Sequence, residues 1–430
     1  MPEEAPAPAD LSRCVHCGLC LNSCPTYQVT GLEAESPRGR IYFARAIEHG
    51  ELPLTSTIQR HWDLCLQCRA CEAVCPSSVP YGRIMEHARA QVDAEPPAGR
   101  LQRALRKIVL RHVVADRLMV RLAMLPARVA ARRPVRALAR KSGVLRIVPG
   151  LARMEAQLPQ HIGRPFRAGG RLAQPRSKAA GRAVLFTGCV MGELFGRVHR
   201  ATGRLLARRG IACEAPADQL CCGALHAHDG DLAYARKLAR KNIDAFEESA
   251  PAPIVVNSAG CGAAMKEYGE LLADDPAYRG RAVAFASRVR DLTEVLAELP
   301  GVRAAFEGSA TYQHACHLAH AQRIREQPLA LMKAVDGCRQ VETDGSDVCC
   351  GAAGIYSLVQ PEMSAKLRAR KAEQFAEHRP DVVVTTNPGC QMQYEAAVAE
   401  AGVPARVMHI AEFLDEAERR TGNRERGPGS

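Results

Sequence analysis

Short apolar runs alternate with helical patterns through the second half of the chain. Helical spacing of apolar residues marks Asp231 to Phe246 and Pro361 to Phe375. Strands that alternate with helices predict a parallel α/β sheet, and the carboxyl ends of such strands are where sites gather. The apolar runs each end at a cysteine, at residues 183–189, 254–261, 310–316 and 381–390. We therefore expect these cysteines to lie close together.

The same half of the chain is an internal repeat. Its cysteine motifs recur at offsets of 127, 128 and 129 residues. A near-constant offset at three places indicates a duplicated domain. Each copy contains a vicinal pair followed by glycine; Cys189, Cys221, Cys222 and Cys261 of the first copy correspond to Cys316, Cys349, Cys350 and Cys390 of the second.

Two further cysteine runs lie near the N-terminus, each with the spacing CxxCxxCxxxCP. In this spacing three thiolates bind one iron-sulfur cube, and the fourth cysteine ligates the other cube. Zinc also binds four thiolates, but its sites usually pair two CxxC units and need no trailing Cys-Pro. The sequence thus predicts two [4Fe-4S] clusters, one on Cys14, Cys17, Cys20 and Cys75, the other on Cys65, Cys68, Cys71 and Cys24.

The segment between the two runs predicts a helix. Ser36 is suited to cap it and Pro37 to occupy its first position. Helical surroundings favour a helical two-cluster ferredoxin over the small β-rich type. Arg38 and Arg40 of this helix either donate to cluster sulfurs or a partner, or form a solvated face. His16 lies between ligands and is expected at the surface.

The composition of the chain bears on its cellular location and on its partners. The chain has 18 cysteines and a formal charge of +12. Its first ten residues lack the apolar segment of a secretory signal, so we expect a cytoplasmic protein whose clustered thiols bind metal. No run approaches the roughly 18 apolar residues of a membrane span, so membrane contact is expected to be peripheral. With 4% aromatic residues and no binding-module motif, no nucleic-acid partner is expected.

A basic connector joins the two halves of the chain. Residues 100–178 contain 20 Lys and Arg against two acidic residues. Leu101, Leu105 and Ile108 fall on one helical face and arginines on the other. Such helices dock on anionic membranes or acidic partners through the basic face. The alternative is an ordinary helix packed on its own chain with the basic face in solvent.

The chain lacks the motifs of a hydride-transferring enzyme. No GxGxxG follows a predicted strand, and no Walker motif is present. An oxidoreductase without such a cofactor takes its electrons from a partner. We therefore expect one subunit of a complex.

Several segments together resemble a known family, the iron-sulfur subunit of bacterial glycolate dehydrogenase (glycolate oxidase). They are CVHCGLC, SPRGRIYFARAIEHGE, DLCLQCRACEAVCPS, SAGCGAAMKEYG, CCGAAGIYSL and NPGCQMQ. The resemblance, from about Arg13 to Leu414, implies electron transfer from FAD-containing subunits that oxidise glycolate to glyoxylate toward a quinone or membrane acceptor. The first alternative function is that of an electron-transfer subunit of a lactate or glycerol-3-phosphate dehydrogenase. The second alternative is a non-catalytic iron-sulfur sensor or scaffold.

The duplicated domains resemble the CCG domains of heterodisulfide reductase. The broader pattern of those domains ends in CxxC, whereas this chain has Ala264 and Gln393 at the last positions. We expect each copy to build a four-thiolate metal site or a redox dithiol, with plain packing as the alternative. His226, His317 and His320 lie beside these cysteines and are candidate proton relays.

These observations predict an α plus α/β fold in which a helical ferredoxin domain precedes a duplicated α/β pair. We place the ferredoxin domain at 1–95, the basic connector at 96–180, the first CCG domain at 181–305 and the second at 306–420. A disordered tail is expected at 421–430.

Overall fold

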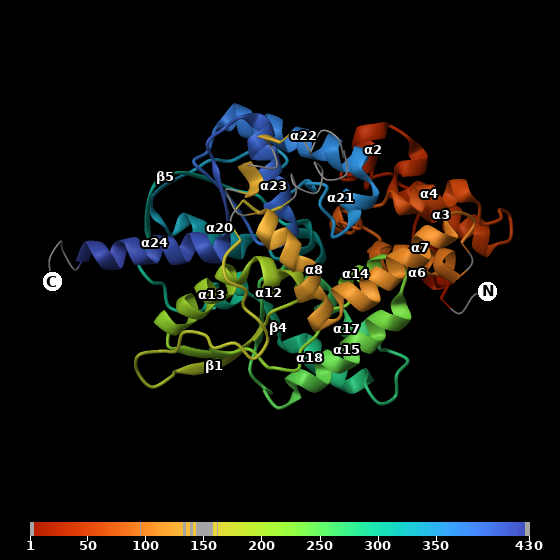
Figure 1. Cartoon of the computed structure of the whole chain (residues 1–430). Helices are drawn as coiled ribbons and strands as arrows, with labels where there is room; N and C mark the ends of the chain where they lie inside the picture. The colour runs from red at the N-terminus through yellow and green to blue at the C-terminus, as the bar shows by residue number, and fades with distance from the viewer. Residues whose placement is uncertain are drawn as a thin grey trace.

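The computed structural model describes residues 4–94, 96–131, 135–137, 141–142, 158–160 and 162–425. Figure 1 shows the N-terminal helices at one end of the molecule, the first α/β domain below and the second above. The described residues include no helix long and apolar enough to cross a membrane. The order of elements agrees with the predicted fold class.

Short helices form the N-terminal domain. Ser36 caps α3, as predicted: its Oγ accepts the backbone N–H of Gly39 at 3.0 Å. The domain packs around Trp62, which is 0% exposed, together with Ile84 and Met85. The elements are α1 (Pro8–Ser12), α2 (Pro25–Thr30), η1 (Glu33–Glu35), α3 (Pro37–Glu48), α4 (Ser56–Asp63), α5 (Ala70–Ala73) and α6 (Tyr81–Ala94).

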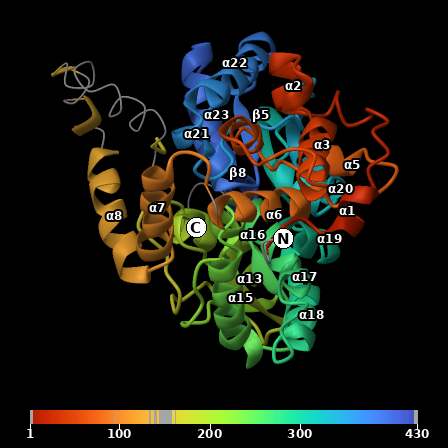
Figure 2. The same ribbon diagram turned by 90° about the vertical axis from the view of Figure 1, so that its right-hand side faces the viewer.

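The connector begins with α7 (Arg100–Val109), continues through the π-helical turn η2 (Leu110–Val114) and then forms α8 (Arg117–Ala130). Asp116 caps α8 by accepting the N–H groups of Leu118 and Met119. Figure 2 shows α7 and α8 at the edge of the molecule.

The connector helices are amphipathic, but their predicted orientation is wrong. The apolar face lies outward: Leu101 is 74% exposed, and Leu105 and Ile108 are more than half exposed. The cations lie inward and form ion pairs. Because a helical pattern defines two faces without saying which one is buried, paired arginines can occupy the inner face. The pairs are Arg103 with Asp63, Arg106 with Asp229, Lys107 with Asp93, and Arg111 with Asp231.

Each repeat contains a four-stranded parallel sheet with the same strand order. The first is β2-β1-β3-β4 and the second β6-β5-β7-β8. Val184 pairs with Ile254 in the first sheet, and Ala310 with Val382 in the second. The strands are β1 (Gly181–Phe186), β2 (Ile211–Glu214), β3 (Ile254–Val256), β4 (Val289–Asp291), β5 (Ala305–Tyr312), β6 (Asp336–Gln340), β7 (Val382–Thr385) and β8 (Arg406–His409).

Helices connect the strands, as parallel pairing requires. The predicted helices at Asp231 and Pro361 are confirmed as α15 and α22. In the first domain the helices are α12 (Val190–Leu194), α13 (Gly196–Arg208), α14 (Ala224–His228), α15 (Leu232–Glu247), α16 (Ala259–Lys266), α17 (Tyr268–Leu271), α18 (Arg279–Arg288) and α19 (Leu292–Glu298). In the second they are η3 (His317–Ala321), α20 (Glu326–Lys333), α21 (Tyr356–Val359), α22 (Pro361–His378), α23 (Pro388–Ala401) and α24 (Ile410–Glu425).

The two α/β domains share one hydrophobic core. It contains Leu185 of β1, Val382 of β7 and Phe413 of α24. Ion pairs between α13 and α24 close this interface, among them Arg204 with Asp415 at 2.7 Å. Helix α24 continues to Glu425, past residue 420, where the sequence places the start of a tail.

Candidate metal centres

Four N-terminal cysteines line one cavity near the surface. They are Cys14, Cys17, Cys20 and Cys75, and Cys71 also contributes to the wall. Cys17 is exposed and the other three are half-buried. Val15 and Leu19, which lie between the cysteines in sequence, are 69% and 61% exposed. This cavity therefore has an apolar and accessible rim.

A second cavity is lined by Cys24, Cys65, Cys68 and Cys71, and all four of these cysteines are buried. The trailing cysteine of each run thus lies beside the other run. This is the arrangement that the crossed pairing requires, although ligation of iron by each cysteine stays a prediction.

The backbone between the cysteines turns sharply. Gly18, Gln67 and Arg69 adopt left-handed conformations, with φ of 84°, 53° and 62°. At a φ of 84° any side chain on residue 18 would be strained, so this turn favours glycine. These turns bring the thiols of each CxxCxxC run toward one cavity.

Burial keeps several of these thiols protonated when no metal is bound. It raises the pKa of Cys20 to about 11 and the pKa values of Cys68 and Cys71 well above 9. Metal ligation therefore has to displace protons from these sulfurs.

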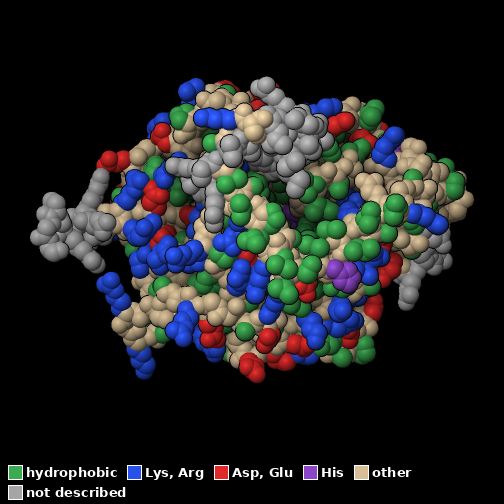
Figure 3. Space-filling model, viewed as in Figure 1, with side chains coloured by type: hydrophobic (Ala, Val, Ile, Leu, Met, Phe, Trp, Pro, Cys, Tyr) green, Lys and Arg blue, Asp and Glu red, His purple; other side chains and the backbone are tan. Residues whose placement is uncertain are grey.

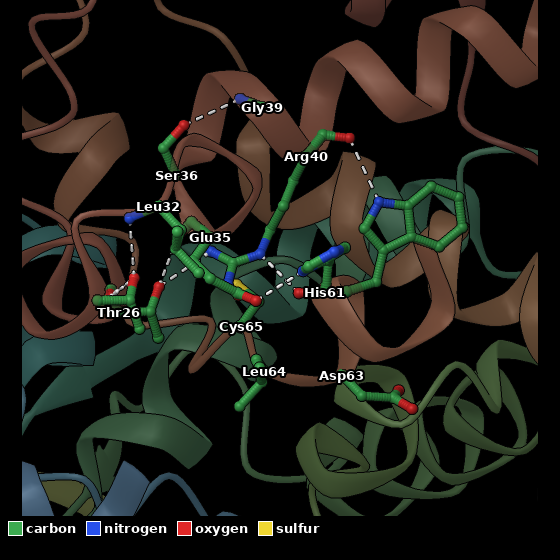
Figure 4. Close-up of polar contacts among 12 residues, drawn as sticks. Thr26, Leu32, Glu35, Ser36, Gly39, Arg40, His61, Asp63, Leu64 and Cys65 are labelled. Carbon is green, nitrogen blue, oxygen red and sulfur yellow. Dashed lines mark hydrogen bonds and ion pairs between the residues drawn. The ribbon is translucent and has the colours of Figure 1, made fainter. Parts of the chain in front are cut away.

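A buried ion pair supports the second cavity (Figure 4). The guanidinium of Arg40, 1% exposed, donates to Glu35 Oε2 at 2.6 Å and to Thr26 Oγ1 at 3.1 Å. Thr26 Oγ1 lies 3.2 Å from Cys24 Sγ, and His61 Nδ1 lies 2.6 Å from Glu35 Oε1. Arg40 therefore is not part of a solvated face, whereas Arg38 pairs with Glu33 near the surface.

The second cavity lies where the N-terminal domain meets both α/β domains. Cys68 packs in one hydrophobic cluster with Cys316 of the second α/β domain. Tyr356 of the same domain donates its hydroxyl to the carbonyl of Leu64 at 2.9 Å. Gln67 Nε2 donates to the carbonyl of His228 in the first α/β domain at 3.1 Å. The buried cavity is thus in contact with both repeats.

In the first repeat, the cysteines meet where the chain leaves two neighbouring strands. Cys189 follows β1 and Cys261 follows β3, and these two strands are adjacent in the sheet. Hydrogen bonds from Cys189 and Cys222 hold the pKa of Cys221 well below 9. Cys222 in turn contacts Cys261. The four residues Cys189, Cys221, Cys222 and Cys261, termed the first quartet, are thus brought together.

The second repeat builds a corresponding group. Hydrogen bonding to Cys349 holds the pKa of Cys316 well below 9, and Cys350 contacts Cys349 and Cys390. Cys316, Cys349, Cys350 and Cys390 are termed the second quartet. All four are buried. Both quartets gather at the strand ends where the sequence predicts them.

Lys371 is a feature of the second quartet that no motif signals. It is 2% exposed, and its ammonium donates to Gln313 Oε1 at 2.9 Å and to the carbonyl of Gly345 at 2.7 Å. Burial lowers its pKa to about 8. Within α22 its sequence surroundings look like those of an ordinary surface lysine, so only the tertiary packing reveals it.

The three candidate relay histidines differ in their surroundings. His320 Nε2 donates to the carbonyl of Asp347 at 3.1 Å. His317 Nδ1 lies 3.7 Å from Cys316 Sγ. His226 is fully buried beside Cys221. His226 and His317 therefore contact a quartet, and His320 is anchored to the backbone.

A large cavity of about 500 Å³ lies between the N-terminal domain and the first α/β domain. Cys222 reaches its wall, together with charged residues such as Arg69, Arg83 and Glu267. Among the described residues, no group of three or more His, Cys, Asp or Glu side chains is spaced to hold a single metal ion. The two cavities that are each lined by four or more cysteines provide the number of thiolates that a [4Fe-4S] cluster takes.

Family models match most of the chain. A model described as a 4Fe-4S dicluster domain matches residues 10–79, and one described as a cysteine-rich domain, CCG, matches 183–266 and 310–395. A model described as the linker region of the glycolate oxidase iron-sulfur subunit matches 101–158. These matches confirm the fold class and the prediction that the chain binds iron-sulfur clusters.

Curated relatives extend the likeness over nearly the full length. The probable glycolate oxidase iron-sulfur subunit of Bacillus subtilis is 36% identical over 417 residues, covering 95% of this chain and 94% of the relative. The glycolate oxidase iron-sulfur subunit of Escherichia coli is 32% identical over 418 residues, with the same coverage. Lactate utilization protein A of an Exiguobacterium species is 32% identical over 236 residues, 54% of this chain and 96% of the relative.

Proposed function

Because the chain belongs to the family of glycolate oxidase iron-sulfur subunits, we propose that it carries electrons from FAD-containing subunits, which oxidise glycolate to glyoxylate, toward a quinone. The observation that carries this proposal is the pairing of an accessible cysteine-lined cavity with a buried one that adjoins both α/β domains. An accessible site where electrons can enter, followed by a buried site that can pass them on, suits an electron relay better than a sensor.

The four cysteines of the exposed cavity, Cys14, Cys17, Cys20 and Cys75, hold the first [4Fe-4S] cluster in this proposal. Cys65, Cys68, Cys71 and Cys24 hold the second. When bound, each cluster accepts and releases one electron. Thr26 and Arg40 support the second site by positioning Cys24 and by placing a buried positive charge near it. That charge favours the reduced, more negative state.

The exposed cavity is the proposed docking place of the flavoprotein. Val15 and Leu19 present apolar surface around Cys17, and Val74 beside Cys75 is 45% exposed. From there the path passes Cys71, which lines both cavities, and then Cys68 and Cys316, which pack together. The large cavity at Cys222 gives an acceptor access to the first quartet.

Isolation of the native complex tests the function. We expect the full-length chain to co-purify anaerobically with an FAD-containing subunit, and that complex to reduce a quinone analogue with glycolate. Turnover with lactate but not glycolate would favour a second candidate function, that of an electron-transfer subunit of a lactate dehydrogenase. The likeness to lactate utilization protein A supports this candidate over about half of the chain. A chain that binds clusters but no flavoprotein would contradict both and favour a sensor or scaffold.

The outward face of the connector suggests how the complex reaches a quinone. Figure 3 shows apolar side chains gathered over α7 and α8. Between Leu101 and Ala130 every arginine and lysine is at least partly buried. Half-buried cations such as Arg121 and Arg128 border this strip. Apolar strips bordered by cations lie in the interface of anionic bilayers, so we propose peripheral membrane binding here. The strip comprises Leu101, Leu105, Ile108, Val109, Leu118, Met119, Leu122, Leu125 and Val129.

Charges placed on this strip are expected to release the protein from membranes. Replacing Leu105, Ile108 and Leu122 with glutamate should lower binding to vesicles containing phosphatidylglycerol at least about tenfold, since each loses about 1 kcal/mol or more of burial in the interface. Vesicle flotation measures this.

Two exposed apolar residues outside the strip provide the control. Val283 and Leu358 are each 57% exposed, and their replacement with glutamate should leave vesicle binding unchanged. If wild-type protein ignored anionic vesicles, or the triple variant bound them normally, the strip would not be a membrane contact.

A further inference from the structure

A buried histidine lies against the first quartet, and no oxygen or nitrogen atom satisfies its ring. His226 is 0% exposed, and among the residues that the structure describes neither ring nitrogen makes a hydrogen bond of good geometry, the thiol of Cys221 being its polar neighbour. Its ring packs on Tyr234 with centroids 4.9 Å apart. Its nearest member of the first quartet is Cys221. An unpartnered buried imidazole is costly unless something else satisfies it.

Among the buried histidines, His314 and His320 also have an unpartnered Nδ1, whereas two others are hydrogen-bonded through both ring nitrogens. His199 contacts the carbonyl of Thr187 through Nε2 at 3.0 Å and Asn257 through Nδ1 at 3.2 Å. His409 contacts the carbonyl of Asn257 at 2.9 Å and the N–H of Ala411 at 3.2 Å. In both cases each ring nitrogen has a partner. His226 is different, and the groups it faces are thiols.

The local backbone delivers this ring to the quartet. Cys221 and Cys222 are followed by Gly223, whose φ of 86° starts α14. His226 is the third residue of that helix. The turn that presents the two vicinal thiols therefore also presents the imidazole, and a shift of the turn would move all three together.

We propose that His226 ligates iron in an iron-sulfur centre whose other protein ligands are the first quartet. Imidazole and thiolate are both good ligands for iron. A neutral imidazole leaves the centre less negative than a fifth thiolate would, which makes it easier to reduce. Such a centre suits the last step before an acceptor in the large cavity beside Cys222. The role as the last centre before an acceptor rests on the proposed function. Ligation of iron by His226 does not depend on it.

The test is pulsed electron paramagnetic resonance of the anaerobically purified full-length protein, grown with ¹⁵N-labelled histidine. We expect more than about eight irons per chain, the content of two cubanes, and a hyperfine coupling from histidine nitrogen. His226→Phe should remove that coupling and lower the iron content while both N-terminal clusters remain. His226→Cys should restore the iron without the nitrogen coupling.

His317 provides the matched comparison, because it lies beside the second quartet. His317→Phe should leave the coupling assigned to His226 unchanged. Absence of any histidine coupling in the wild type, or its survival in His226→Phe, would overturn the proposal. Absence of the coupling in the wild type overturns the proposal even if a variant fails to fold, and His226→Cys assigns a coupling that is present. Glycolate-dependent quinone reduction by the complex tests the function separately, since it can persist when this ligation is disproved.

Discussion

Replacing Cys75 with alanine is expected to destroy the first cluster, although it lies 55 positions after Cys20 in the sequence. Cys75 shares its cavity with Cys14, Cys17 and Cys20, so the crossed pairing makes it the fourth ligand. The variant should contain about four irons fewer than the wild type. Its electron paramagnetic resonance spectrum should match that of Cys14→Ala and differ from that of Cys65→Ala.

Electron transfer from the flavoprotein should stop in this variant, because the accessible entry site is lost. Cys338→Ala is the control: this cysteine lies in β6, outside all the motifs, and its loss should leave iron content unchanged. If Cys75→Ala kept the first cluster and lost the second, each run would ligate its own cube and the crossed assignment would be wrong.

Replacing Arg40 with methionine should destabilise the N-terminal domain by about 3–5 kcal/mol, because it leaves the carboxylate of Glu35 buried without its main partner. The ion pair is almost completely buried, with Arg40 1% and Glu35 4% exposed in their side chains. Urea unfolding, followed by loss of the visible absorbance of the clusters, measures the effect. The same variant should lower the reduction potential of the second cluster.

Arg38 lies in the same helix and provides the control. Its pair with Glu33 is exposed, so Arg38→Met should cost about 0–1 kcal/mol. The double variant Arg40→Met with Glu35→Gln should regain part of the lost stability, because the unpaired charge is gone. Equal destabilisation by both single variants would show that burial of the ion pair is not the cause.

Much of the fold could be predicted because local signals agree with the tertiary structure. Ser36 and Pro37 mark the start of α3, and the apolar runs before Cys189 and Cys390 contain central strands. The edge strands β2 and β6 carry no such signal. They are only partly buried, so their sequences lack the continuous apolar character of a central strand.

The surroundings of the site were less predictable. The pattern of α3 does not reveal that Arg40 is buried, because a long cation is normally expected in solvent and becomes stable inside only when paired. Likewise the sequence shows the vicinal cysteines, but only the packing shows that His226 faces them without another partner. Both facts depend on contacts between segments far apart in sequence.

The inward cations of α7 and η2 have a mechanical consequence. Arg103 and Lys107 bind aspartates of the N-terminal domain, whereas Arg106 and Arg111 bind aspartates of the first α/β domain. This segment therefore links the N-terminal domain to the first α/β domain through ion pairs on both sides. Direct contacts such as Arg69 with Glu267 also join these domains, so rising ionic strength should weaken the attachment of the connector before either domain unfolds.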